Sequence, residues 1–153
     1  MKLLTQGRAR RFGISNFTFR QMEHAWNYTN GKIFTNQIEY HIHLSQDKIK
    51  SFADDHGILI TAYSPLGHNG YVLREEKLQP IVEKYNVTVA QVCLARLLQQ
   101  GCVVIPRSKN EGRMKENLAS LSLTLDEEDL AVIASLPKHY RYINPPFAPK
   151  WDE

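Results

Sequence analysis

The chain has 153 residues, of which 19 are Lys or Arg and 16 are Asp or Glu, giving a formal net charge of +3. A hydrophobic content of 42% and a charged content of 23% are ordinary for a globular protein and argue against disorder along the whole chain. No apolar run approaches the roughly 20 residues of a membrane span, and the first residues lack the apolar core of a signal peptide. The sequence therefore predicts a cytoplasmic protein with no membrane partner.

Four short segments rich in apolar and β-branched residues predict buried strands. They are residues 11–15, 33–39, 59–63 and 102–105. Helical patterns lie between them, and strands that alternate with helices indicate an α/β fold with a parallel sheet. The faces of such a sheet are covered by helices or closed into a barrel.

Each predicted helix has a start signal in the sequence. The expected N-terminal caps are Thr18 with Gln21, Ser45, and Thr88 with Gln91, and residues 124–127 are expected to open the last helix. The side chains expected to face the core are Phe19, Met22 and Trp26; Ile49, Phe52 and Ala53; Val89, Val92, Cys93 and Leu97; and Leu130, Ile133 and Leu136. Gly57 and Pro137 are the expected stops of the second and the last helix.

The composition changes after residue 136, so we divide the chain into an α/β unit at residues 1–136 and a tail at residues 137–153. The tail is rich in proline and aromatic residues, which predicts an extended segment rather than a helix. Its aromatic side chains, Tyr140, Tyr142, Phe147 and Trp151, either line a pocket or cover an exposed edge of the sheet.

The remaining features favour ordinary structural roles. The basic cluster of Arg8, Arg10 and Arg11 is too small for a nucleic-acid footprint, so no nucleic acid is expected as a partner. Cys93 and Cys102 lie in or beside apolar segments without metal-ligand spacing, which predicts free buried thiols.

His41 and His43 form an H-x-H pattern that is compatible with zinc, because alternate residues of a strand face the same side. No further acidic or histidine ligand set appears at the other predicted strand ends. We therefore predict no metal site.

Polar residues gather where the predicted strands end, and ligands of parallel α/β folds bind at that edge. These residues are Ser15, Asn16, Gln37, Glu39, Tyr63, Ser64, Arg107 and Ser108. Asn16 and Gln37 each offer a donor and an acceptor to an amide, and Tyr63 can stack on an aromatic ring. Arg107 and Arg113, with the start of a helix at Glu111, can hold phosphate. The combination suits a dinucleotide with a nicotinamide at one end, although the chain has no G-x-G-x-x-G loop.

Four motifs in this order resemble the aldo-keto reductase family. They are residues 13–17 (GISNF), 36–41 (NQIEYH), 63–67 (YSPLG) and 105–108 (IPRS), followed by Arg113, Glu116 and Asn117. The closing residues 148–152 (APKWD) resemble the tails of the small bacterial diketogluconate reductases. The resemblance implies a (β/α)8 TIM barrel and NADPH-dependent reduction of aldehydes and ketones.

The resemblance also implies a role for each matching residue in binding NADP(H). The nicotinamide carboxamide would be held by Ser15, Asn16 and Gln37, and its ring would stack on Tyr63. Ser64 and Leu66 would lie against the pyrophosphate. The adenosine 2′-phosphate would be held by Arg107, Ser108 and Arg113, and the adenine by Glu116 and Asn117.

The chain matches only the second half of the family barrel, strands five to eight. The proton-donating tyrosine of the family and its aspartate, lysine and histidine partners come from the first half, and no segment here resembles those motifs. Tyr63 matches the ring-stacking position and is no substitute for the donor. We therefore assign no catalytic residue, expect no turnover from this chain alone, and infer a truncated gene product, a fragment or a deliberate half-barrel.

Half a barrel of four parallel strands has two free edges, and each unpaired buried backbone group costs roughly 1–3 kcal/mol. Three arrangements relieve this cost: a homodimer that closes eight strands about a two-fold axis, a rearrangement within one chain, or a separate chain that supplies the missing half. We favour the homodimer. The functional hypotheses are a reductase that is active only with the missing half, a self-associating module that binds NADP(H) without turnover, and a non-functional relic.

Overall fold

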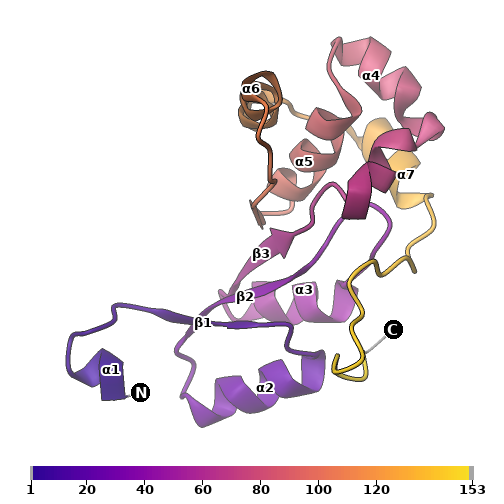
Figure 1. Ribbon diagram of the computed structural model, residues 1–153. Helices are drawn as coiled ribbons and strands as arrows, with labels where there is room; N and C mark the ends of the chain where they lie inside the picture. The colour runs from indigo at the N-terminus through magenta and orange to yellow at the C-terminus, as the bar shows by residue number, and fades with distance from the viewer. Residues whose placement is uncertain (1, 152–153) are drawn as a thin grey trace.

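Four parallel strands form one sheet in the order β1-β2-β3-β4, which is also their order along the chain (Figure 1). The computed structural model describes residues 2–151. The strands are β1 (Phe12–Ser15), β2 (Ile33–Glu39), β3 (Leu59–Tyr63) and β4 (Val103–Val104). The predicted number, place and parallel direction of the strands are confirmed, although β1 and β4 are shorter than expected.

Helices follow the strands as the alternating pattern predicted. They are α1 (Lys2–Thr5), α2 (Phe19–Tyr28), α3 (Asp47–Asp55), α4 (Gln79–Tyr85), α5 (Val89–Gln99), α6 (Glu111–Ala119) and α7 (Glu127–Ala134). Short 3-10 segments occupy His68–Arg74, Glu76–Leu78 and Ser120–Ser122. Helices α2 and α3 lie near β1 and β2, whereas α4 to α7 gather at the β4 end of the sheet (Figure 1).

The two predicted capping boxes are confirmed. Thr18 Oγ1 accepts the Gln21 amide N–H at 3.4 Å, and Gln21 Oε1 accepts the Thr18 N–H at 3.0 Å. Thr88 and Gln91 make the same pair of bonds at 3.3 and 3.0 Å. These helices therefore begin where their local sequence directs them.

The prediction that Ser45 caps a helix is wrong, because α3 begins one residue later with Gln46 as its N-cap. The Ser45 N–H donates to Lys138 O at 3.1 Å, next to an antiparallel bridge between Leu44 and His139. The C-terminal tail thus holds this segment extended up to Ser45, and the helix starts only beyond that contact.

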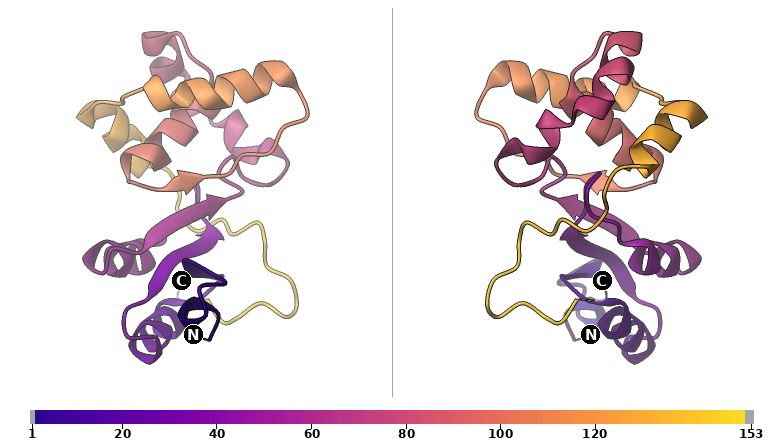
Figure 2. Two further views of the ribbon diagram at one scale, coloured as in Figure 1. Left: turned by 90° about the vertical axis from the view of Figure 1, so that its left-hand side faces the viewer. Right: turned by 90° about the vertical axis from the view of Figure 1, so that its right-hand side faces the viewer.

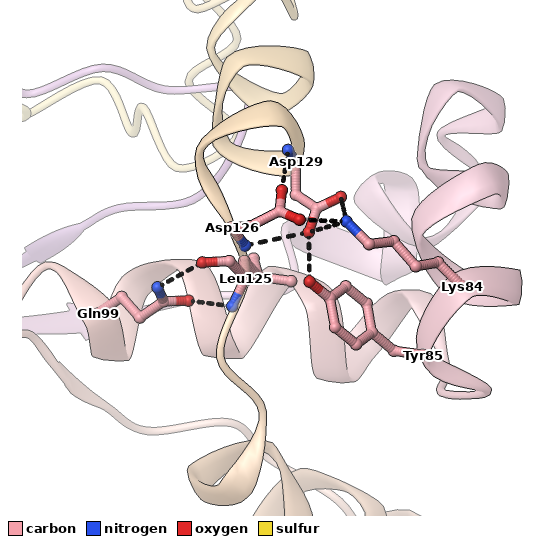
Figure 3. Close-up of polar contacts among 6 residues, drawn as sticks. All are labelled: Lys84, Tyr85, Gln99, Leu125, Asp126 and Asp129. Atoms are coloured by element: carbon pink, nitrogen blue, oxygen red, sulfur yellow. Dashed lines mark hydrogen bonds and ion pairs between the residues drawn. The ribbon is translucent and has the colours of Figure 1, made fainter.

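The last helix opens within residues 124–127 as predicted, with Asp126 as the N-cap of α7 (Figure 3). Gln99 holds Leu125 extended by two bonds to its backbone, from Gln99 Nε2 to Leu125 O at 3.0 Å and from Leu125 N to Gln99 Oε1 at 2.8 Å. The helix then opens on a reciprocal box in which Asp126 and Asp129 accept each other's backbone N–H.

Two apolar cores stabilise the chain. The first lies between the sheet and α2 and α3 and includes Met22, Ile38 and Ile60. The second lies among α4, α5 and α7 and includes Val92 and Ile133. Cys93 and Cys102 are buried free thiols, as predicted. No helix in residues 2–151 is long and apolar enough to cross a membrane.

Only one face of the sheet is covered by helices. In β3 the buried residues Ile60 and Ala62 alternate with Leu59, Thr61 and Tyr63, which are exposed or half-buried. Because alternate side chains of a strand point to opposite faces, the second group lies on the other face, where Leu59, Val103 and Ile105 are 37%, 43% and 44% exposed. This uncovered face carries apolar side chains that stay partly exposed.

The residues after α7 form no further helix up to Trp151. Figures 1 and 2 both show this tail running from the end of α7 back toward α2 and β1. It therefore passes the carboxyl ends of the strands, where the sequence predicts the ligand site.

Candidate functional site

The first part of the candidate site is the turn that leaves β1. Asn16 has φ of +56°, a left-handed conformation that asparagine tolerates better than most residues. Its backbone N–H donates to Gln37 O at 2.9 Å, and Ser15 Oγ donates to the same carbonyl at 3.0 Å. These two bonds tie the end of β1 to β2 and fix the place of the Asn16 side chain.

Strand register brings the predicted nicotinamide residues to one edge. Ser15 is paired with Gln37 across β1 and β2, and Glu39 is paired with Tyr63 across β2 and β3. Since parallel strands end at the same edge, Ser15, Asn16, Gln37 and Tyr63 lie on three neighbouring strand ends. The structure thus groups these four residues as the sequence predicted.

Ser15, Asn16 and Tyr63 form one wall of a pocket of about 490 Å³. Asn16 Oδ1 and Tyr63 Oη are buried there, and neither makes a hydrogen bond of normal geometry with the described residues. Burial, followed by the nearby charge of Glu39, raises the pKa of Tyr63. A buried acceptor without a donor is suited to a ligand N–H, such as that of a carboxamide.

The loop after β3 lies beyond Tyr63. Ser64 has φ of +47°, and the Gly67 N–H closes the turn on Ser64 O at 2.8 Å. Leu66 packs against the second apolar core. The two residues predicted to face a pyrophosphate are thus held in the turn directly after β3.

A second group of predicted residues follows β4. Ser108 Oγ accepts the Asn110 N–H at 3.1 Å, and Asn110 Oδ1 accepts the Arg113 N–H at 3.0 Å as the N-cap of α6. Arg107 and Arg113 are exposed beside this helix start. Two guanidinium groups next to a helix N-terminus can hold a phosphate group.

Glu116 and Asn117 are half-buried on α6. Neither they nor Arg107, Ser108 and Arg113 line the pocket at Asn16. The predicted residues therefore form two separate groups, one across β1 to β3 and one after β4. Neighbouring strands are about 4.8 Å apart, so these groups lie at opposite ends of one sheet edge roughly 14 Å long. An extended ligand could contact both groups.

The opposite wall of the pocket comes from the tail, for whose aromatic side chains the sequence had left two roles open. It is formed by Ile143, Pro145, Phe147, Ala148, Pro149 and Trp151, while Phe17 and Gln21 complete the pocket near β1. Phe147 and Trp151 thus line a pocket, which decides between the two roles left open for them. Tyr142 lies elsewhere and stacks on Tyr71, with ring centroids 5.6 Å apart.

Glu39 has a structural role that its place at the end of a predicted strand did not reveal. Its side chain is fully buried at the end of β2 and accepts the backbone N–H groups of Tyr142 and Ile143 at 2.8 and 3.0 Å. The available signal was its spacing two residues after Gln37, which places both side chains on one face of the strand.

His41 and His43 each contact a different carboxylate and do not point to one shared ion. His41 Nδ1 accepts the His43 N–H at 3.2 Å, so His41 Nε2 is the nitrogen that donates to Glu39 Oε1 at 3.1 Å. His43 Nε2 lies 3.0 Å from Glu75 Oε2. Among residues 2–151 no group of three or more His, Cys, Asp or Glu residues is arranged to hold a metal ion.

The fold and the site define an α/β protein with a parallel four-stranded sheet and polar groups along the carboxyl ends of its strands. The family model for "Aldo/keto reductase family" matches residues 1–138. The chain belongs to the aldo/keto reductase family.

Relatives and solved structures agree with this assignment. The chain is 40% identical over 149 residues to methylglyoxal reductase DkgB of Escherichia coli O157:H7, covering 96% of this chain and 55% of that protein. A crystal structure described as that of a 2,5-diketo-D-gluconic acid reductase B superposes with a TM-score of 0.93 at 36% identity, covering 99% of this chain and 55% of that one. The Gox0644 D53A mutant in complex with NADPH superposes with a TM-score of 0.84 at 35% identity, covering 90% of this chain and 51% of that one. The chain spans about half the length of the curated relatives it matches.

Proposed function

We propose that this chain is the NADP(H)-holding half of an NADPH-dependent reductase of aldehydes and ketones. The observation that carries the proposal is the alignment of Asn16, Gln37 and Tyr63 on three adjacent strand ends, with an unsatisfied buried acceptor at Asn16 Oδ1. A structural neighbour in complex with NADPH supports the same nucleotide. When bound, the nicotinamide would supply the hydride for carbonyl reduction.

Each group of residues has a distinct task in this proposal. Asn16 Oδ1 would accept a carboxamide N–H, and Ser15 and Gln37 would orient the same amide. The Tyr63 ring would support the nicotinamide from one face. Arg107, Ser108 and Arg113 would pair with the 2′-phosphate, and Glu116 and Asn117 would contact the adenine.

We further propose that the chain alone does not turn over a carbonyl substrate. A phenol that protonates an alkoxide near neutral pH needs neighbours that lower its pKa. Burial and the Glu39 charge instead raise the pKa of Tyr63, the tyrosine in the pocket. In this proposal the proton donor comes from another polypeptide segment.

The uncovered face of the sheet would take a second copy of the chain. A two-fold axis parallel to the strands preserves their direction, so β4 of one copy pairs with β1 of the other in parallel, twice. Leu59, Val103 and Ile105 would then enter the interior of an eight-stranded barrel. Solved neighbours about twice as long as this chain support a complete barrel that needs a second half of similar size.

Two measurements test the proposals. In a fluorescence titration the parent chain should bind NADPH. Arg113→Ala should lower its affinity for NADPH by about tenfold or more, because a charge-assisted contact with the 2′-phosphate is lost. The affinity for NADH, which has no 2′-phosphate, should change little. Lys115→Ala is the matched control, since Lys115 is exposed on the same helix and pairs only with Glu111 among residues 2–151. Equal losses for both nucleotides would contradict the assigned phosphate site.

Light scattering after size-exclusion chromatography tests the assembly. A dimer is expected at micromolar concentration. A well-folded monomer would refute self-association, and a monomer that associates only when the complementary half-barrel is added would assign the face to that half instead. Loss of NADPH absorbance with a generic aldehyde should be absent for the 153-residue chain, and turnover would refute the proposed lack of a donor.

A further inference from the structure

Glu39 is a buried carboxylate whose hydrogen bonds reach across the whole length of the chain. Its side chain is 0% exposed, and its two oxygens accept His41 Nε2, Tyr142 N and Ile143 N. Arg141 Nη1 lies 3.7 Å from Glu39 Oε2. Burial alone would raise the pKa of Glu39, but the bonds from His41, Tyr142 and Ile143 hold it below the usual value. The carboxylate therefore stays ionised inside the protein.

The two tail N–H groups take no part in a backbone hydrogen bond of a strand or helix. Tyr142 and Ile143 lie in irregular backbone, and their N–H groups both end on Glu39. The residues just before them are held by backbone contacts, from Tyr140 N to His43 O at 2.9 Å and through the bridge between Leu44 and His139. Glu39 is thus the last backbone anchor before the tail crosses the pocket.

A chain of contacts continues from this anchor to the far wall of the pocket. The Arg141 guanidinium lies over the Trp151 ring, 3.8 Å from its centroid. Trp151 Nε1 donates to Asn144 Oδ1 at 2.9 Å, which closes the segment into a loop. Ile143 and Trp151 both line the pocket opposite Asn16 and Tyr63. The placement of this wall therefore depends on what holds residues 141–143.

We propose that Glu39 is a positioning residue that fastens the C-terminal segment against the strand ends and so forms the second wall of the nucleotide pocket. The proposal rests on the proposed function for the identity of the ligand, but the fastening itself is a property of the chain without ligand. Residue 39 acts through the tail and does not line the pocket.

Hydrogen exchange and tryptophan fluorescence test the fastening directly. Glu39→Gln keeps the size of the side chain but leaves one acceptor oxygen for the two tail N–H groups. Its NH2 group is a donor and cannot accept the second N–H. Loss of a charge-assisted bond should raise exchange at Tyr142 and Ile143 by about tenfold or more. In a Trp26→Phe background, Trp151 is the remaining tryptophan, and its quenching by acrylamide should increase as well. Ile143→Pro removes the Ile143 donor from the tail side. In this variant exchange at Tyr142 and acrylamide quenching of Trp151 should both increase.

Ile60→Val is the matched control, because Ile60 is buried in the first core and does not line the pocket. It should lower global stability without a selective change at residues 141–151. Exchange that rises evenly over β2, β3 and the tail in Glu39→Gln, or that stays unchanged in the tail, would overturn the proposal.

NADPH affinity separates this inference from the proposed function. If the parent chain binds NADPH, both Glu39→Gln and Ile143→Pro should weaken binding by about tenfold, with less effect from Ile60→Val. Release of the tail with unchanged affinity would overturn the role of Glu39 in the pocket. Failure of the parent to bind any NADPH would overturn the proposed function, whereas the exchange and quenching results would still decide the fastening.

Discussion

The close approach of β1 to β2 depends on the absence of a side chain at Gly13. A Cβ built there would lie 2.5 Å from Thr35 Cγ2 and 2.9 Å from Thr35 O, both shorter than real contacts allow. The strand register shifts beside this residue, between Phe12 and Gly13. Gly13→Ala must therefore push β1 away from β2, and overpacking of this kind costs about 1–3 kcal/mol.

The destabilisation by Gly13→Ala has two parts, one from the contact with Thr35 Cγ2 and one from the contact with the Thr35 carbonyl. Thr35→Ser removes Cγ2 but keeps the hydroxyl that donates to Leu59 O at 2.8 Å. The double variant should recover about 1 kcal/mol relative to the sum of the two single changes, because the contact with Cγ2 is gone. Recovery should be partial, since the contact with the Thr35 carbonyl remains.

Urea unfolding of the parent, the two single variants and the double variant measures this coupling. Gly13→Ala should also weaken NADPH binding, because Ser15 and Asn16 follow on the same strand. Free energies of unfolding that simply add, within about 0.3–0.5 kcal/mol, would refute the steric explanation.

Four further substitutions, at Asn16, Asp129, Tyr85 and Lys138, have expected results. Asn16→Gly keeps the left-handed backbone and removes the amide, so it should weaken NADPH binding in a fluorescence titration while the urea midpoint stays near that of the parent. Asp129 is 4% exposed and accepts Tyr85 Oη at 2.7 Å (Figure 3), so Asp129→Ala should lower the free energy of unfolding by about 1–3 kcal/mol and Tyr85→Phe by less. Burial, followed by the charge of Arg96, lowers the pKa of Lys138 to about 8. Between pH 8 and the unfolded value of 10.5 the unfolded chain then binds more protons at this residue, so the stability of the parent relative to Lys138→Met should rise with pH in that window when measured by urea unfolding. A difference that is flat or falls with pH would contradict this assignment.

The strands and two of the helix starts were predictable because their signals are local. The capping boxes at Thr18 and Thr88 need only four consecutive residues, and the alternation in residues 59–63 matches the burial of β3. The wrong cap at Ser45 has a distant cause, because the tail holds Ser45 extended. Leu125 is likewise held extended by Gln99 just before α7 begins. In both places a contact distant in sequence sets the first residue of the helix.

Residues 68–85 were missed for a different reason. The 3-10 turns and α4 bury only a few apolar side chains, among them Val72, Leu78 and Ile81, without a repeating stripe. Their place is set by the second core, which α5 and α7 complete from later in the chain. Pro80 in the first turn of α4 was the one local signal available.

The candidate site shows the same division between local and distant information. Asn16, Gln37 and Tyr63 could be predicted together, because strand ends of a parallel sheet share one edge. The two backbone N–H groups that donate to Glu39 could not be predicted, since they lie 103 and 104 residues further along the chain. An acid at a strand end is usually solvated, and only the fold reveals that backbone amides replace the water.

The uncovered face connects the proposed assembly to the proposed ligand. Tyr63 lies on the same face of β3 as Leu59, which is 37% exposed. A second half-barrel that covers Leu59, Val103 and Ile105 would therefore also adjoin the pocket at the strand ends. Binding and association that share one surface are thermodynamically linked, so NADPH should tighten self-association by the same factor that association tightens NADPH. Sedimentation velocity with and without saturating NADPH measures the first factor, and titration at two protein concentrations measures the second. Two unequal factors would mean that ligand and partner do not meet at this edge as proposed.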